Sequence, residues 1–142
     1  TAYPHPKPRQ VLPSRAAWFL ILHNPQGEVL LERRPPTGIW GGLWSLPECQ
    51  VTENPLDWCR AHLGVEAQLV EKLPVRRHTF SHFKLEIKPL RLRLEKWPDR
   101  VAESDGLIWH TPGVALAVGL PAPVDRLLRE ISSDRIASDG IQ

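Results

Sequence analysis

One stretch of the chain carries the side-chain type that proteins use to bind phosphate groups. Residues 72–100 hold nine lysines and arginines against three acids, giving this stretch a net charge of +6 and the remainder −4. Such a cationic region is typical of proteins that bind a phosphate backbone, although a charged stretch is more often only a solvated face. The charge pattern alone leaves both interpretations open.

A second arrangement concerns metal chemistry. Glu48 follows Gly42 after five intervening residues and precedes a predicted helix, which resembles the opening of the Nudix box, the G-x5-E-x7-REUxEExGU signature of diphosphate hydrolases. Those enzymes hold Mg²⁺ against a diphosphate with several carboxylates on one helical face, because this cation prefers oxygen ligands. The paired glutamates are replaced here by Arg60 and Ala61, or by Ala61 and His62 if one residue is inserted. We therefore expect Glu48 to be a loop or capping carboxylate, and we expect no metal ligand and no catalytic residue in this chain.

The segment between residues 35 and 44 is rich in proline and glycine, which forbid regular structure, and it carries two large indole rings. We interpret Trp40 and Trp44 as core side chains, because base stacking suits single-stranded nucleic acids. Gly41 and Gly42 either shape a turn or let backbone N–H groups approach a phosphate, since a Cβ would block such an approach.

The first half of the chain predicts a hairpin and a helix. Residues 15–23 form a short apolar run typical of a strand buried on both faces, and the turn sequence at 24–27 joins it to a second strand at 28–34. Asn54 is expected to cap a helix over residues 55–63, which ends before a glycine. The buried face of this helix is expected to carry Leu56, Cys59 and Leu63.

The second half predicts further strands and a closing helix. Residues 83–87 place apolar side chains at odd positions, whereas leucines at 90, 92 and 94 take even positions, which predicts a bulge at or near Lys88–Pro89. A strand within 65–75 precedes them, and a strand at 107–109 and a short helix from Thr111 follow. The closing helix is expected to bury Val124, Leu127, Leu128 and Ile131. The sum is an α/β (α+β) domain with a mixed, mainly antiparallel sheet flanked by helices.

Length and composition indicate one folded domain. The 142 residues, 42% of them hydrophobic, suffice for a single core. We expect a proline-rich linker over residues 1–14, the domain over 15–132 and a polar tail over 133–142. Cys49 and Cys59 are too few for a disulfide framework, so we expect them to pack in the core. No apolar run approaches the roughly 18–20 residues of a membrane span, and the lack of methionine predicts a fragment or processed piece of a longer protein.

Three separated segments point together to one family. They are ERRPPTGIWGGLW at 32–44, RHTFSHF at 77–83 and VGLPAPV at 118–124. In this order they closely resemble the C-terminal, Nudix-like domain of the MutY-family adenine DNA glycosylases, and the match covers nearly the whole chain. The proline-rich start resembles the interdomain linker of that family. The resemblance implies a Nudix-like fold.

The resemblance also implies a function and a larger protein. The family's C-terminal domain recognises 8-oxoguanine opposite adenine in duplex DNA, while the preceding helical domain flips out and excises the adenine in base-excision repair. The catalytic acids and the 4Fe–4S cluster belong to that preceding domain, so we expect this fragment to hold no cofactor and to be inactive alone. Its expected partners are duplex DNA containing 8-oxoguanine:adenine and its own catalytic domain. We expect a monomer, in the cytoplasm or, in a bacterium, at the nucleoid.

The resemblance assigns a recognition loop to Phe80, Ser81 and His82, which match the FSH loop of the family. Oxidation at C8 makes guanine N7 carry a hydrogen, so a reader must present an acceptor there, and a serine hydroxyl can do so. Phe80 would pack near the base pair, and His82 would support the loop or approach a phosphate. The candidate phosphate contacts are Arg76, Arg77, Lys84, Gly41 and Gly42.

Two other function classes remain open at this stage. The chain could be a true Nudix hydrolase of an oxidised nucleotide or another nucleoside diphosphate, with Glu48 and distant acids forming an unusual metal site. It could also be a protein-interaction module, for which exposed tryptophans would be the feature to find.

Overall fold

The computed structural model describes residues 11–96, 106–114 and 119–139, without the side chains of 96 and 132–139. Most of the predicted linker, the end of the cationic stretch and the last three residues of the predicted tail therefore lie outside the described residues.

The N-terminal hairpin forms as predicted. β1 (Ser14–His23) and β2 (Val29–Arg33) are antiparallel strands. The turn between them is closed by a hydrogen bond that the Gly27 N–H donates to the Asn24 carbonyl oxygen at 3.0 Å. The centre of β1, residues 19–22, is fully buried, so this strand is covered on both faces as its uninterrupted apolar run indicates.

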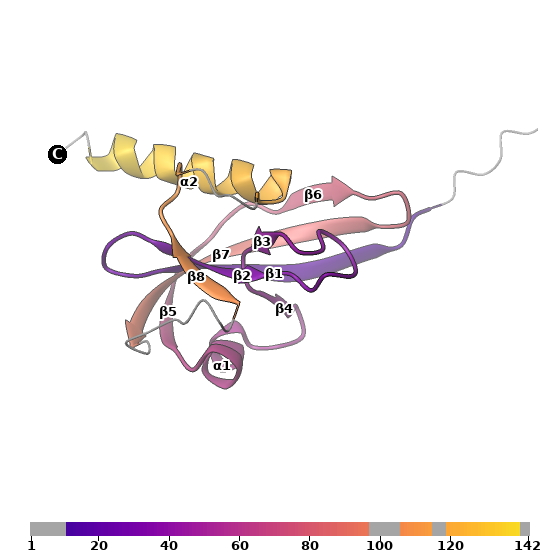
Figure 1. Ribbon diagram of the computed structural model, residues 1–142. Helices are drawn as coiled ribbons and strands as arrows, with labels where there is room; N and C mark the ends of the chain where they lie inside the picture. The colour runs from indigo at the N-terminus through magenta and orange to yellow at the C-terminus, as the bar shows by residue number, and fades with distance from the viewer. Residues whose placement is uncertain (1–10, 97–105, 115–118, 140–142) are drawn as a thin grey trace, which may run out of the picture.

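The long strand β7 (Lys84–Lys96) organises one side of the sheet (Figure 1). It runs parallel to β1 in a continuous register that begins at Ser14 opposite Lys84. Its other edge pairs antiparallel with two shorter strands, β6 (Arg76–Thr79) at its start and β5 (Glu66–Lys72) further along.

Three short strands complete the sheet on the side of β1 and β2. β3 (Trp44–Ser45) and β8 (Leu107–His110) each pair antiparallel with β2, and β4 (Glu48–Gln50) pairs antiparallel with β1. The β1–β7 pair is thus the parallel element in an otherwise antiparallel sheet, which confirms the predicted mixed sheet.

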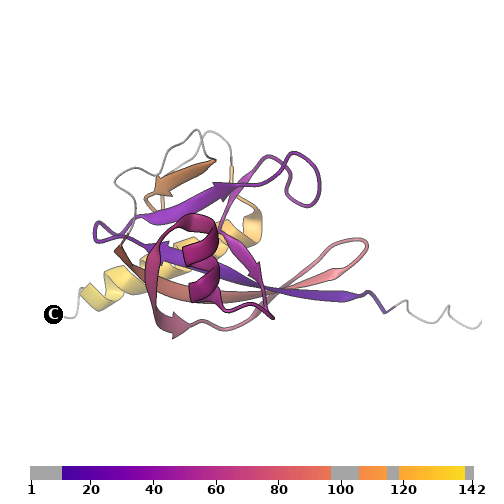
Figure 2. The same cartoon turned by 90° about the horizontal axis from the view of Figure 1, so that it is seen from below.

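The helices lie on opposite faces of the sheet, as the two views show (Figures 1 and 2). α1 (Pro55–Trp58) is followed by a π-helical turn, η1 (Cys59–Leu63), so the predicted helix has the expected bounds but a wider second turn. Asn54 caps it as predicted, because its side-chain oxygen accepts from the N–H groups of Leu56 and Asp57.

α2 (Ala122–Asp139) is the predicted closing helix, and it buries the four expected apolar side chains. It also continues to Asp139, so residues 133–139 of the expected tail are helical. Instead of starting a helix, Thr111 opens a turn that Val114 closes; residues 115–118 lie outside the described residues. Within the described ranges, no helix is both long and apolar enough to cross a membrane.

The core has two layers, one on each face of the sheet. The α2 side contains Phe19, Ile21, Leu31, Leu85 and Ile87 together with the apolar face of α2. The α1 side contains Leu20, Leu22, Leu30, Leu90, Leu92 and both cysteines. Because Cys49 and Cys59 are free thiols within this layer, the expectation that they pack in the core is confirmed.

The predicted bulge at Lys88–Pro89 is wrong. β7 keeps an unbroken register with β1 through both residues, and its side chains continue to alternate. The apolar phase changes because the first half of β7 faces the α2-side core while the second half faces the α1-side core. The irregularities of this edge lie instead in the pairing of β5, between Glu66 and Ala67 and between Leu69 and Glu71.

Candidate functional site

The predicted recognition loop forms the tip of the β6–β7 hairpin. The Phe80 N–H donates to the Phe83 carbonyl oxygen at 2.8 Å, which closes a tight turn. Ser81 and His82 are exposed at this tip, while Phe83 is buried beneath it. In the sequence Phe-Ser-His-Phe, the two outer residues hold the turn with their rings, and the two polar side chains between them face solvent.

An aromatic cluster supports the tip from the α2 side of the sheet. The Phe80 ring stacks on Phe83 with centroids 4.7 Å apart and meets the edge of His78 at the same separation. Trp40 lies 5.4 Å from Phe80 and 6.4 Å from Phe19, so it joins the tip to the buried core. The Arg15 guanidinium of β1 lies 4.5 Å from the centroid of the Phe83 ring.

Trp40 reaches this position through a strained backbone. Its φ of 54° is the one left-handed value at a non-glycine residue in the described part of the chain. The Gly42 N–H donates to the Pro35 carbonyl oxygen, and a Cβ on Gly41 would stand 2.5 Å from the Pro36 carbonyl oxygen. Both glycines therefore shape this loop, and the Gly42 N–H is engaged within the chain.

The candidate phosphate contacts divide into free and engaged cations. Arg76 forms an ion pair with Glu130 of α2, which ties it to the body of the domain. Arg77 has 74% of its side chain exposed, and its Nε lies 3.5 Å from Glu86 Oε1, at the outer limit of a hydrogen bond. Lys84 is exposed beside the tip. Geometry thus leaves Arg77 and Lys84 as the accessible cations of this hairpin.

Glu48 lies in β4, away from the tip, and binds a cation of the chain itself. Its Oε1 accepts from Arg34 Nη1 at 2.7 Å, and both side chains are about four-fifths buried. Burial raises the pKa of Glu48 above its usual value, with Arg34 opposing that shift and Glu32 adding to it. Burial likewise raises the pKa of Glu32, against the nearby charges of Arg34 and His62.

The residues that replace the acidic pair of the Nudix signature also have structural partners. Arg60 forms ion pairs with Asp57 and Glu66, and its pKa is raised chiefly by the hydrogen bond to Glu66. The His62 ring stacks on Trp58 at 4.7 Å. In the described ranges, no group of three or more His, Cys, Asp or Glu side chains gathers in a way that could hold a metal ion.

Sequence reasoning missed three supports of the tip. They are Trp40, His78 and Phe83. His78 and Phe83 flank the motif in the same hairpin, whereas the loop of Trp40 is distant in sequence, so no local pattern joins Trp40 to the tip. Trp40 and Trp44 are half-buried against the α2-side core, which confirms their interpretation as packing side chains.

The sequence and the fold both match a known protein family. The family model described as NUDIX domain matches residues 17–130, which begin within β1 and end halfway along α2. The chain belongs to the Nudix domain family. Solved Nudix structures share the fold: a MutT Nudix hydrolase from Burkholderia pseudomallei superposes with a TM-score of 0.65 at 18% identity, covering 83% of this chain and 98% of that one.

Within the Nudix family, the chain resembles the C-terminal domain of adenine DNA glycosylases, as its three motifs predicted. It is 26% identical over 132 residues to the adenine DNA glycosylase of Buchnera aphidicola subsp. Acyrthosiphon pisum, covering 93% of this chain and 37% of that protein. It therefore spans little more than a third of the length of this relative. The C-terminal domain of mouse MUTYH, solved in complex with human PCNA, superposes with a TM-score of 0.66 at 21% identity, covering 84% of this chain and 88% of that one.

Proposed function

We propose that this domain recognises 8-oxoguanine opposite adenine in duplex DNA, as the lesion-reading part of an adenine DNA glycosylase. The observation that carries the proposal is the hairpin tip, where Ser81 and His82 are exposed above the packed rings of Phe80 and Phe83. The curated relatives named adenine DNA glycosylase support the same function. Excision of the adenine, and the 4Fe–4S cluster, would belong to a separate catalytic domain, with this fragment inactive alone.

The chemistry of the tip fits the lesion. The oxidised guanine presents an N7–H donor where guanine presents an acceptor, and the exposed Ser81 hydroxyl can accept from it. The packed turn beneath Ser81 matters because a binding group must be held in place by its supporting side chains. Phe80 contributes by anchoring the turn through Trp40 and Phe83, and the accessible cations Arg77 and Lys84 would hold the phosphates on either side.

The test is a titration of the chain with two duplexes at one fixed low salt concentration, since phosphate contacts depend on salt. One duplex carries 8-oxoguanine:adenine and the other guanine:adenine, and backbone NMR shifts are followed. We expect shifts centred on residues 76–83 and larger with the lesion. Ser81→Ala should reduce the preference for the lesion by about 1–3 kcal/mol, the size of a good base contact. Thr79→Ala is the matched control, because it removes another exposed hydroxyl from the same hairpin.

Equal binding of both duplexes by the wild-type chain would contradict the proposal. An unaltered preference in Ser81→Ala would remove Ser81 from the recognition contact. If neither duplex shifts the tip, the same titration with the catalytic domain restored decides whether recognition needs both domains.

The alternative, a Nudix hydrolase of an oxidised nucleotide, rests on the fold shared with solved hydrolases. The Arg34–Glu48 ion pair argues against it, because a guanidinium already neutralises the carboxylate that this alternative needs for its unusual metal site. Incubation with 8-oxo-dGTP and Mg²⁺ tests it: release of diphosphate that Glu48→Gln abolishes would favour the hydrolase.

A further inference from the structure

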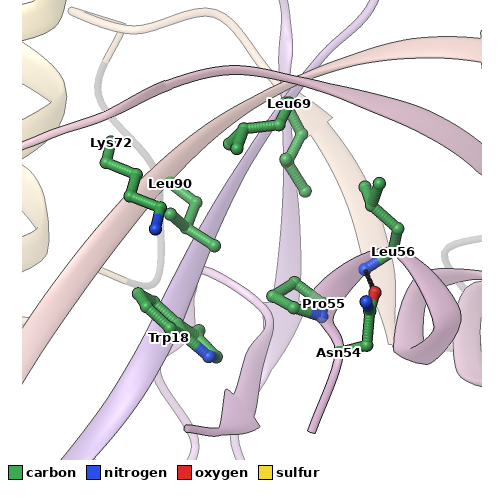
Figure 3. Close-up of a pocket in the computed structure, with 8 residues that line it drawn as sticks. Trp18, Asn54, Pro55, Leu56, Leu69, Lys72 and Leu90 are labelled. Atoms are coloured by element: carbon green, nitrogen blue, oxygen red, sulfur yellow. Dashed lines mark hydrogen bonds between the residues drawn. The ribbon is translucent and has the colours of Figure 1, made fainter.

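A second, unassigned feature lies on the α1 side of the sheet, the face opposite the aromatic cluster. It is a cavity of about 220 Å³ between α1, β5 and the strands β1 and β7 (Figure 3). Its walls are Trp18, Leu56, Leu69, Leu90, Leu92 and the stem of Lys72. This volume is below the roughly 300–1,000 Å³ of typical small-molecule pockets, and it suits one large apolar side chain.

The cavity is accessible from the edge of the sheet. Leu69, which lines the cavity, is 43% exposed. β5 pairs with β7 on one side, and within the described residues no strand covers its other side. A chain segment can therefore lie along β5 and reach the cavity over Leu69, which favours a chain segment over a small molecule.

The rim also carries positive charge. Lys72 Nζ lies 5.8 Å and Lys88 Nζ 5.5 Å from the centroid of the Trp18 ring, so two ammonium groups stand over one indole (Figure 3 shows the first). In the part of the chain that the structure describes, neither lysine forms an ion pair. Glu71, the acid next to Lys72 in the sequence, is paired with Arg91. Covering these ammonium groups without a counter-charge would be costly, which favours an acidic occupant.

We propose that this cavity binds an acidic peptide segment of another protein, which inserts one large apolar side chain between Trp18 and Leu69 and places its carboxylates against Lys72 and Lys88. A nucleic acid fits less well, because a phosphate backbone gains nothing from the exposed Leu69. The cavity and the hairpin tip occupy opposite faces of the sheet, so the proposal stands independently of lesion recognition.

The test uses the full chain and a fluorescein-labelled pentapeptide with one phenylalanine between two pairs of aspartates, followed by fluorescence anisotropy. We expect saturable binding that weakens with added salt. Replacing the phenylalanine of the peptide by serine should weaken binding by at least about tenfold, equivalent to 1.4 kcal/mol. Leu69→Ser should have a similar effect through the wall of the cavity.

Charge reversal distinguishes binding at Lys72 and Lys88 from non-specific attraction between the peptide and the positively charged protein. Lys72→Glu with Lys88→Glu should weaken peptide binding by at least about tenfold. The control, Arg126→Glu with Arg129→Glu, makes the same change in net charge on α2, which covers the opposite face of the sheet, and should leave peptide binding nearly unchanged. Circular dichroism melting shows that each variant is folded, and a variant that fails to fold is replaced by the single substitutions Lys72→Gln and Lys88→Gln.

Equal loss of binding in both double variants would overturn the proposal, because the attraction would then be non-specific. Absence of saturable binding up to millimolar peptide would overturn it as well. So would displacement of the peptide by a single-stranded oligonucleotide that shifts the resonances of Trp18 and Leu69, since the cavity would then be a nucleic-acid site. Lesion preference, measured separately, reports on the tip alone.

Discussion

Trp40 and Phe80 come from different loops, and their rings meet with centroids 5.4 Å apart. This contact joins the glycine-rich loop after β2 to the hairpin that presents Ser81. The ring of Trp40 also reaches Phe19 in the buried core. Trp40 therefore helps to position the exposed tip through its contact with Phe80.

Substitutions at Trp40 should separate the contribution of the ring from that of the backbone. Trp40→Ala removes the ring and should lower the free energy of unfolding by about 2–4 kcal/mol, less than for a fully buried tryptophan. Trp40→Gly removes the same ring but adopts a φ of 54° without strain, so it should be more stable than Trp40→Ala by about 1 kcal/mol. Urea denaturation measures both values. If alanine proves the more stable, the strain assigned to Trp40 is wrong.

Gly41→Ala should destabilise the domain, because the added Cβ would lie 2.5 Å from the backbone oxygen of Pro36. Overpacking of this kind costs about 1–3 kcal/mol. Gly119→Ala is the control, since its Cβ would meet nothing within 4 Å, and it should change stability by less than about 0.5 kcal/mol. Thermal melts compare the two. Equal melting temperatures would show that the loop yields to the extra methyl group.

Glu48 should make stability fall as pH rises. Burial raises its folded-state pKa above the ordinary value of 4.5. Between pH 4.5 and this raised pKa, the folded protein binds more protons than the unfolded chain. Its favourable contribution is present below pH 4.5 and is lost as pH rises through the raised pKa. Stability of Glu48→Gln relative to wild type should therefore increase over that window, measured by denaturation at each pH. A difference that stays constant with pH would contradict the raised pKa.

His110 should act in the opposite direction. It is buried at the end of β8, and burial lowers its pKa below 6.5 although the nearby Asp125 opposes the shift. The unfolded chain then binds the proton more readily, so stability is lost as pH falls from 6.5 through the lowered pKa. His110→Gln should lack this dependence, and denaturant titrations between neutral and acidic pH compare it with wild type. Parallel profiles for the two proteins would show that His110 does not titrate differently on folding.

Several elements were predictable because their signals are local. The turn at 24–27 and the apolar run before it determine the first hairpin, and Asn54 with Pro55 marks the start of α1. The bulge in β7 was wrongly predicted because the apolar residues move from odd to even positions along this strand. That change reflects which face of the strand is covered by a core layer, not a break in the alternation of its side chains. A strand between two core layers changes its covered face without any bulge.

The site was predictable only where one segment carries it. The motif at 80–82 predicted a loop, and these residues lie in the turn between β6 and β7. The ion pair of Arg76 with Glu130 and the contact of Trp40 with Phe80 join distant segments, so no local pattern reveals them. The cavity beside Trp18 was missed for the same reason, since β1, α1, β5 and β7 each supply part of its wall.

The parallel pairing of β1 with β7 also has a consequence for the order of folding. It joins Ser14 to Lys84, so seventy residues must be enclosed in a loop before the central pair of strands can form. During synthesis, the apolar centre of β1 leaves the ribosome long before β7, the strand that pairs along its whole length, exists. We therefore expect this long-range pairing to slow folding. Until β7 is made, the edge of β1 that pairs with it has no partner in the sheet and is open to pairing with another chain.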